Sequence, residues 1–155
     1  MADLLSVKDV TISYPTEAGT FTAVRDVSFR VAPGEKFILL GPSGCGKSTL
    51  LKAVAGFMKP SAGSIELEGR GITRPGPDRV VIFQEFDQLL PWKTVLGNVV
   101  YPLKVAKKMA DGDAREEALR FIRMVGLERF ADSYPHQLSG GMKQRVAIAR
   151  ALAIN

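Results

Sequence analysis

A glycine-rich segment at residues 41–48, Gly-Pro-Ser-Gly-Cys-Gly-Lys-Ser, constrains this chain more than any other feature. It follows the apolar run Phe-Ile-Leu-Leu at residues 37–40, which predicts a strand buried on both faces, and it precedes a helix predicted over residues 47–55. Glycines let the backbone curl so that successive N–H groups point inward as an anion nest, and the helix adds its positive end. This spacing between a strand and a helix therefore predicts a phosphate-binding loop.

Within the loop, Lys47 is expected to present a mobile ammonium to the β- and γ-phosphates of ATP, and Ser48 a hydroxyl to Mg²⁺. We assign Lys47 a catalytic role as well. Cys45 stands at a free position of the motif, where a small side chain that fits is favoured over a redox role. The predicted ATP-binding residues here are Gly41, Pro42, Ser43, Gly44, Cys45, Gly46, Lys47, Ser48 and Thr49.

The rest of the chain predicts an α/β fold, with a phosphate-loop NTPase core, an antiparallel β front and a helical insert. Apolar and polar residues alternate at positions 10–14 and 27–31 around a turn-rich stretch, which predicts an antiparallel pair. Residues 64–68 predict a surface strand, and the apolar run at 80–83 predicts a second buried strand. Helical periodicity appears at residues 113–125 and again after Ser139.

A second motif, Leu-Ser-Gly-Gly-Met-Lys-Gln-Arg at residues 138–145, opens the last predicted helix. A serine hydroxyl, free N–H groups and the helix dipole make this a second potential phosphate site. One chain rarely needs two phosphate-binding helix starts for one triphosphate. A simple solution is a head-to-tail pair of chains, in which each phosphate loop faces the other chain's Ser-Gly-Gly turn.

Together, the loop, Gln84 after an apolar run, and residues 138–145 resemble the ATP-binding subunit of ABC transporters over essentially the whole chain. The resemblance implies one domain at residues 1–155, with a nucleotide-binding core over about 1–85, a helical insert over about 86–138, and the turn and following helix at 139–155. It also implies that Ser139, Gly140 and Gly141 contact the γ-phosphate bound to the partner chain.

The same resemblance assigns two further residues. Gln84 would help hold Mg²⁺, orient the attacking water and link the nucleotide to the helical insert. Tyr14 would stack on adenine, although a strand-end aromatic packed on its neighbours remains an alternative. An incidental polar residue remains the alternative for Gln84, as does a simple N-cap and turn for Ser139 and Gly141.

The stretch from Leu90 to Val99, with Leu90, Pro91 and Trp92 at its start, resembles importers of the nitrate, sulfonate and taurine type. A proline-fixed loop presenting Leu90 and Trp92 would form an apolar knob that docks on a membrane-spanning partner. A tryptophan that packs into its own domain is the alternative. His136, the only histidine, is interpreted as structural or surface-exposed.

Hydrolysis in this family also needs an apolar strand ending in Asp-Glu and a later histidine. No Asp-Glu pair occurs in the sequence, and no histidine follows residue 136. We therefore expect a chain truncated before that strand, which binds nucleotide but hydrolyses it poorly, because a lost general base costs about 10²- to 10⁴-fold in rate. The apolar face of the last helix would then lack the strands that it should cover, so we expect the chain to aggregate or to fold poorly.

Composition sets the remaining limits. The 155 residues are 46% hydrophobic and 24% charged, which suits one globular domain. No apolar run is long enough to cross a membrane, the single cysteine excludes an internal disulfide framework, and we expect no secretory leader. We expect a cytoplasmic protein on the inner face of the membrane, with a second ATP-binding subunit and permease subunits as partners and a solute-binding protein as an indirect one. The net charge of +5 is interpreted as solvated surface, although anionic membrane or nucleic acid remains open.

Two other functions remain possible. The chain could be an ATPase of the same superfamily acting on nucleic acid, or an inert, truncated nucleotide-binding module. Aromatic and basic residues do not interleave as they do in single-strand binders, so no nucleic-acid partner is expected.

Overall fold

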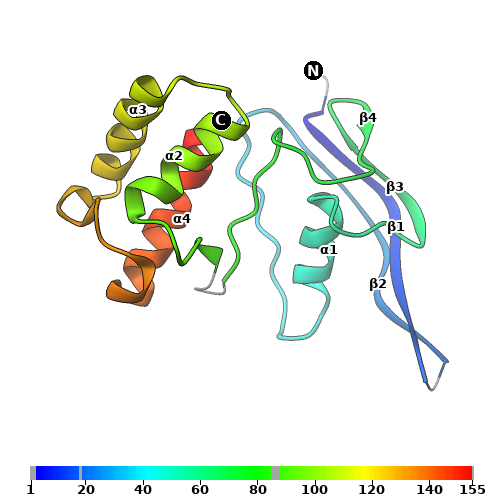
Figure 1. Cartoon of the computed structure of the whole chain (residues 1–155). Coiled ribbons are helices and arrows are strands. Elements are labelled where there is room, and N and C mark those ends of the chain that lie inside the picture. Colours follow the sequence, from blue (N-terminus) through cyan, green and yellow to red (C-terminus); the bar gives the residue numbers. More distant parts are fainter. Residues whose placement is uncertain (1–2, 18, 85–87, 155) are drawn as a thin grey trace. The chain divides into compact units, whose positions relative to one another are not determined.

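The computed structural model describes residues 3–17, 19–84 and 88–154, and the chain divides into two compact units after Arg79. Figure 1 shows a first unit built on a β-sheet and a second built on helices. Within the described residues, no helix combines the length and the apolar character that crossing a membrane requires.

Over the residues described for the first unit, the sheet has four antiparallel strands in the order β2-β1-β3-β4. The strands are β1 (Leu5–Thr16), β2 (Gly19–Val31), β3 (Ala62–Leu67) and β4 (Arg70–Gly71). The long β1–β2 pair confirms the antiparallel front that alternation predicted. Ile12 pairs with Val24 whereas Ser13 pairs with Thr22, so Ala23 is an extra residue that forms a β-bulge in β2.

Helix α1 (Lys47–Val54) follows the glycine-rich loop and packs on this sheet. It buries Leu50 and Ala53, whose spacing of three residues places both side chains on one face of the helix. The resulting core contains Val7, Val10, Ile12, Val24, Leu50, Ala53 and Ile65. This core fixes the helix start, and with it the loop, against β2.

The prediction of two buried strands, at residues 37–40 and 80–83, was wrong. Residues 37–40 and 80–83 form no strand, and Ile38 and Leu40 are 74% and 89% exposed. An apolar run becomes a strand only when a neighbouring strand satisfies its N–H and C=O groups, and no described strand pairs with either run. Phe37 instead stacks on Phe29 of β2, with the ring centroids 4.5 Å apart.

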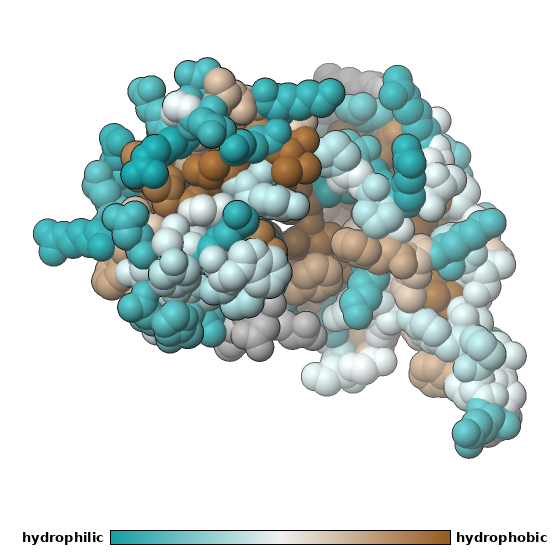
Figure 2. Space-filling model, viewed as in Figure 1, coloured by the Kyte–Doolittle hydropathy of each residue, from teal (hydrophilic) through white to brown (hydrophobic). Residues whose placement is uncertain are grey.

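The face seen in Figure 2 is mostly hydrophilic, with hydrophobic surface in separate places.

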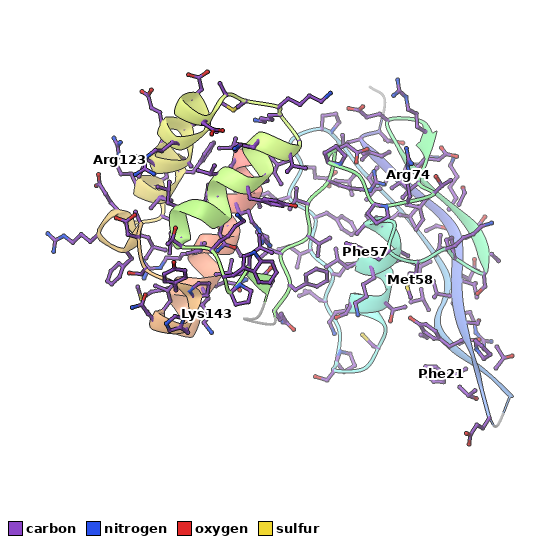
Figure 3. The ribbon with its side chains drawn as sticks, in the orientation of Figure 1. Phe21, Phe57, Met58, Arg74, Arg123 and Lys143 are labelled. Atoms are coloured by element: carbon purple, nitrogen blue, oxygen red, sulfur yellow. The ribbon has the colours of Figure 1, made fainter. Side chains whose placement is uncertain are left out.

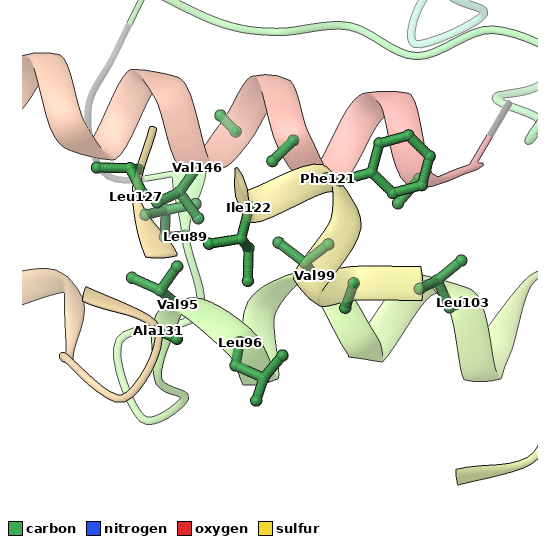
Figure 4. Packing of buried hydrophobic residues seen from close by; sticks show 14 of the residues in the cluster. Leu89, Val95, Leu96, Val99, Leu103, Phe121, Ile122, Leu127, Ala131 and Val146 are labelled. Carbon is green, nitrogen blue, oxygen red and sulfur yellow. The ribbon is translucent and has the colours of Figure 1, made fainter. Parts of the chain in front are cut away.

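The described residues of the second unit form three α-helices, which share one apolar core (Figure 4). They are α2 (Val95–Val105), α3 (Asp111–Met124) and α4 (Gly140–Ile154), with 3-10 turns η2 (Glu128–Phe130) and η3 (Pro135–Gln137) before α4. Residues of all three helices fill the core, including Val99, Ile122 and Val146, each with no exposed surface. The helices predicted at residues 113–125 and after Ser139 are thereby confirmed as α3 and α4.

Candidate nucleotide-binding site

Gly46, the last glycine of the loop, caps α1 in a left-handed conformation, with φ at +92°. A Cβ atom at this position would lie 2.4 Å from the carbonyl oxygen of Ala23 and 2.9 Å from a methyl carbon of Val24. The bulge in β2 therefore meets the loop at the point where the helix begins. Gly46 must be glycine both for its backbone angle and for this close approach.

Lys47, the first residue of α1, turns its ammonium back over the loop. Its Nζ donates hydrogen bonds to the carbonyl oxygens of Gly41, at 2.8 Å, and Pro42, at 2.6 Å. The same nitrogen lies 3.5 Å from Sγ of Cys45, which is exposed. These acceptors are neutral, and an anionic phosphate oxygen forms a stronger, charge-assisted bond with an ammonium. The ammonium of Lys47 therefore lies at the loop, where it can exchange these carbonyl oxygens for the oxygens of a bound phosphate.

The helix start fits a phosphate in other respects. No side chain caps the N-terminus of α1, and its first turn contains no acidic residue, so its N–H groups keep their positive character. Ser48 is exposed and Thr49 half-buried. In the part of the chain that the structure describes, no cluster of His, Cys, Asp and Glu could hold a metal ion.

Tyr14 was predicted from the sequence to stack on adenine. Its ring is half-buried and packs against the core between the sheet and α1, and its hydroxyl donates to Sδ of Met58 at 3.6 Å. Its partner across the strand pair is Phe21, which is 58% exposed. Sequence reasoning missed Phe21, because only the register reveals that it stands opposite Tyr14.

Gln84 is exposed and belongs to the second unit, next to residues 85–87, which lie outside the described residues. The side-chain amide of Gln88 accepts from the Phe83 N–H at 3.2 Å and donates to the Phe83 carbonyl at 3.0 Å. Gln144 of the second motif donates to the same carbonyl at 3.4 Å and accepts from Gln88 at 3.3 Å. Helix α4, which the Ser-Gly-Gly turn opens, is thus hydrogen-bonded to Phe83, the residue before Gln84. The sequence alone did not reveal this contact.

The Ser-Gly-Gly turn is an exposed helix start. Oγ of Ser139 accepts from the Met142 N–H at 3.4 Å, and its carbonyl accepts from the Lys143 N–H at 3.0 Å. Ser139 therefore acts as the N-cap of a 15-residue helix. Gly140 is half-buried and Gly141 exposed, and a Cβ on Gly141 would meet only open space. The turn leaves room for a group approaching from outside the chain.

The loop from Leu90 to Trp92 is fixed by a buried amide. Asn98, with no exposed surface, accepts from the Leu90 N–H at 2.8 Å and donates to the carbonyls of Leu90, Lys93 and Thr94 at 3.0–3.1 Å. Trp92 is 70% exposed, so it does not pack into its own domain. Pro91 is also exposed and Leu90 half-buried.

His136 is exposed and stacks on Tyr134, with the ring centroids 5.9 Å apart. This agrees with its interpretation as a structural or surface residue.

The predicted residues thus fall into two sets, each positioned by its own unit. The loop and Tyr14 belong to the sheet unit, and Gln84, Trp92 and the Ser-Gly-Gly turn belong to the helical unit. A phosphate loop that opens a helix beside an antiparallel sheet, followed by a helical unit with a second glycine-rich helix start, defines a nucleotide-binding protein of the phosphate-loop class.

Comparison with known proteins identifies the family within that class. The family model described as ABC transporter matches residues 24–155. The chain therefore belongs to the ABC transporter family. The nitrate import ATP-binding protein NrtC of Synechococcus elongatus is 52% identical over 139 residues, which are 88% of this chain and 21% of that protein.

Two further relatives extend over nearly the whole chain. The taurine import ATP-binding protein TauB of Rhizobium johnstonii is 49% identical over 98% of this chain and 58% of its own length. The bicarbonate transport ATP-binding protein CmpD of Synechocystis sp. is 47% identical over 97% of this chain and 53% of its own length. The chain thus spans about half the length of these two relatives and a fifth of NrtC.

Solved structures show the same fold. The dimeric, post-hydrolysis structure of the ATP-binding cassette MJ0796 with ADP and Pi superposes with a TM-score of 0.85, at 37% identity, over 97% of this chain and 70% of that one. The cbiO1 protein of Clostridium perfringens, part of the transporter complex cbiONQ, gives a TM-score of 0.80 at 29% identity, over 99% of this chain and 62% of that one.

Proposed function

We propose that this chain belongs to an ATP-binding and ATP-hydrolysing subunit that powers an ABC importer of nitrate, sulfonate, taurine or a similar small solute. The observation that carries the proposal is the ammonium of Lys47, held 2.8 Å and 2.6 Å from two carbonyl oxygens of the glycine-rich loop at an uncapped helix start. The relatives that import nitrate and taurine support the transport role and the solute class.

In this proposal the loop binds the triphosphate through backbone N–H groups and the positive end of α1. The ammonium of Lys47 leaves the loop carbonyls and neutralises charge on the β- and γ-phosphates, where charge also develops as the phosphoryl group transfers. The hydroxyl of Ser48 would supply one ligand to the Mg²⁺ that accompanies the nucleotide.

The second half of the site comes from another subunit. The exposed turn at Ser139 and Gly141 presents a hydroxyl and free N–H groups of the α4 helix start to the γ-phosphate held by the partner's loop. The dimeric MJ0796 cassette with ADP and Pi supports a paired arrangement of this kind. The Leu90-Pro91-Trp92 loop then docks on a permease subunit at the inner face of the membrane, since Trp92 is exposed and the loop is rigidly fixed by Asn98.

Hydrolysis by these 155 residues alone should be slow, because no Asp-Glu pair is present to polarise the attacking water. The proposal is tested by titrating the chain with ATP in the presence and absence of Mg²⁺ and by following phosphate release. We expect one ATP bound per chain, an affinity that Mg²⁺ raises in the wild type but not in Ser48→Ala, and turnover well below that of an intact transporter subunit. Absence of ATP binding, or turnover that DNA or RNA stimulates, would contradict the importer assignment.

A further inference from the structure

The segment around helix α2 is basic and contains no acidic residue. Residues 88–110 include no Asp, Glu or Arg, and their charged residues are Lys93, Lys104, Lys107 and Lys108. The last three lie in the final turn of α2 and directly after it, and all three are exposed. A cation in the last turn of a helix offsets the helix dipole, but this effect fades beyond that turn. Lys107 and Lys108 are therefore not explained by the helix end alone.

Helix α3 of the same unit carries mixed charge instead, with acidic and basic residues interspersed along it. Nη2 of Arg120 lies 2.6 Å from Oε1 of Glu117, and Nε of Arg123 lies 3.4 Å from Oε1 of Glu128. Figure 3 shows Arg123 on the outer side of the helical unit. Because acids on or beside α3 balance its arginines, α3 presents no excess of positive charge, whereas the segment around α2 does.

Apolar side chains lie among the lysines of α2. Tyr101 is 48% exposed and Val105 62% exposed, and their spacing of four residues places them on one face of the helix, with Lys104 beside them. The ammonium of Lys93 lies over the Tyr101 ring, 5.6 Å from its centroid. Lys104 pairs with Asp111, but both side chains are largely in water, where such a pair is weak. We call these residues the α2 basic surface: Lys93, Tyr101, Lys104, Val105, Lys107 and Lys108.

This combination of side chains fits the boundary between lipid headgroups and acyl chains. A tyrosine places its ring at the headgroup level, and lysine stems lie along apolar surface while their ammonium groups reach the phosphates. Single-stranded nucleic acid would need an open aromatic face on which a base can stack, and Lys93 already covers one face of Tyr101. The cations are all lysines, which act as point charges and lack the bidentate fork of arginine. An anionic phospholipid is therefore the partner that the surface fits best.

We propose that the α2 basic surface binds the headgroups of anionic phospholipids at the inner face of the membrane. The proposal rests on the proposed function, in which the loop from Leu90 to Trp92 docks on a permease subunit. Helix α2 begins three residues after Trp92, and its 11 residues span about 16 Å, so the basic surface lies close to that loop. Two weak contacts on one rigid unit, one to protein and one to lipid, strengthen each other because the second forms at high effective concentration.

The test is flotation of the chain with vesicles in a density gradient, in which only lipid-bound protein rises and self-association of the protein does not count. The vesicles are phosphatidylcholine alone, or phosphatidylcholine with phosphatidylglycerol as the anionic lipid. The variant Lys104→Gln with Lys108→Gln removes two charges from the surface. The matched control, Arg115→Gln with Arg129→Gln, removes two charges from other exposed positions of the same unit. Thermal melting checks that each variant is folded.

We expect the wild type to float with the anionic vesicles and not with the neutral ones, and the bound fraction to fall as salt is raised. The lysine variant should weaken the partition coefficient about ten- to thirtyfold, and the arginine control less than about threefold. Failure of the wild type to float with anionic vesicles would overturn the proposal, as would equal losses in the two variants. Tighter binding of the wild type to single-stranded RNA than to these vesicles would overturn it as well.

The outcome is separate from that of the proposed function. The vesicles contain no permease, and the α2 basic surface includes no residue of the phosphate loop, so both double variants should keep wild-type affinity for MgATP. A wild-type chain that floats with anionic vesicles but binds no ATP would refute the proposed function alone. A chain that binds ATP but does not float would refute this inference alone.

Discussion

The carbonyl oxygen of Ala23 occupies the space that a side chain on Gly46 would need, since a Cβ there would lie only 2.4 Å away. The extra residue in β2 and the left-handed glycine thus fit together at the base of the phosphate loop. This contact fixes the direction from which α1 leaves the loop. It also makes the site sensitive to the smallest possible substitution.

Gly46→Ala should therefore lower both stability and nucleotide affinity. The methyl group adds a backbone clash to the strain of a non-glycine residue at φ +92°, for a combined cost of about 2–4 kcal/mol. The matched control is Gly69→Ala, where φ is +74° but no atom lies within 4 Å of the added methyl group. Urea unfolding should show a loss of about 1 kcal/mol for the control and a clearly larger loss for Gly46→Ala. Equal losses would show that the Ala23 contact has no effect.

Asn98→Leu should destabilise the helical unit, although the side chain that it replaces is fully buried and makes no contact with solvent. The substitution leaves the Leu90 N–H and the carbonyls of Leu90, Lys93 and Thr94 without their buried partner, at a cost of about 3 kcal/mol. Trp92→Ala in the same loop is the control and should change stability by less than about 0.5 kcal/mol, because the side chain is 70% exposed. Chemical unfolding measures both values. A small loss for Asn98→Leu would mean that another group replaces the amide.

The apolar run at residues 37–40 should make this chain associate in solution. Ile38 and Leu40 are 74% and 89% exposed, and exposed apolar surface of this kind favours contact between molecules. Ile38→Ser combined with Leu40→Ser should shift the sedimentation profile toward monomer and leave the melting temperature nearly unchanged. A wild-type chain that is monomeric at every concentration tested would refute this expectation.

Local patterns predicted the elements whose neighbours are close in sequence. Alternation at residues 10–14 identified β1 because its partner β2 follows after a short turn. The helix predicted over residues 47–55 corresponds to α1, and a helix needs no partner segment to form its hydrogen bonds. The runs at 37–40 and 80–83 were wrongly predicted as strands, because apolar character does not supply a pairing neighbour.

The candidate site residues also divide into those that a local motif predicts and those that depend on distant contacts. The loop at residues 41–48 and the Ser139 turn are contiguous motifs, and the sequence locates both. Phe21 and the network of Gln88 and Gln144 depend on register and on contacts between distant segments, which one sequence does not display. Asn98 was visible as part of a motif, but its role in fixing the loop at Leu90 follows only from its burial and its hydrogen bonds.

The most direct measurement of the central claim is the affinity for MgATP of Lys47→Ala compared with that of Lys52→Ala, a lysine in the last turn of the same helix. Because Lys47 holds its ammonium at the loop and Lys52 does not, Lys47→Ala should raise the dissociation constant about ten- to a hundredfold, and Lys52→Ala should leave it unchanged. Equal affinity of both variants and the wild type would contradict the assignment of residues 41–48 as the triphosphate site.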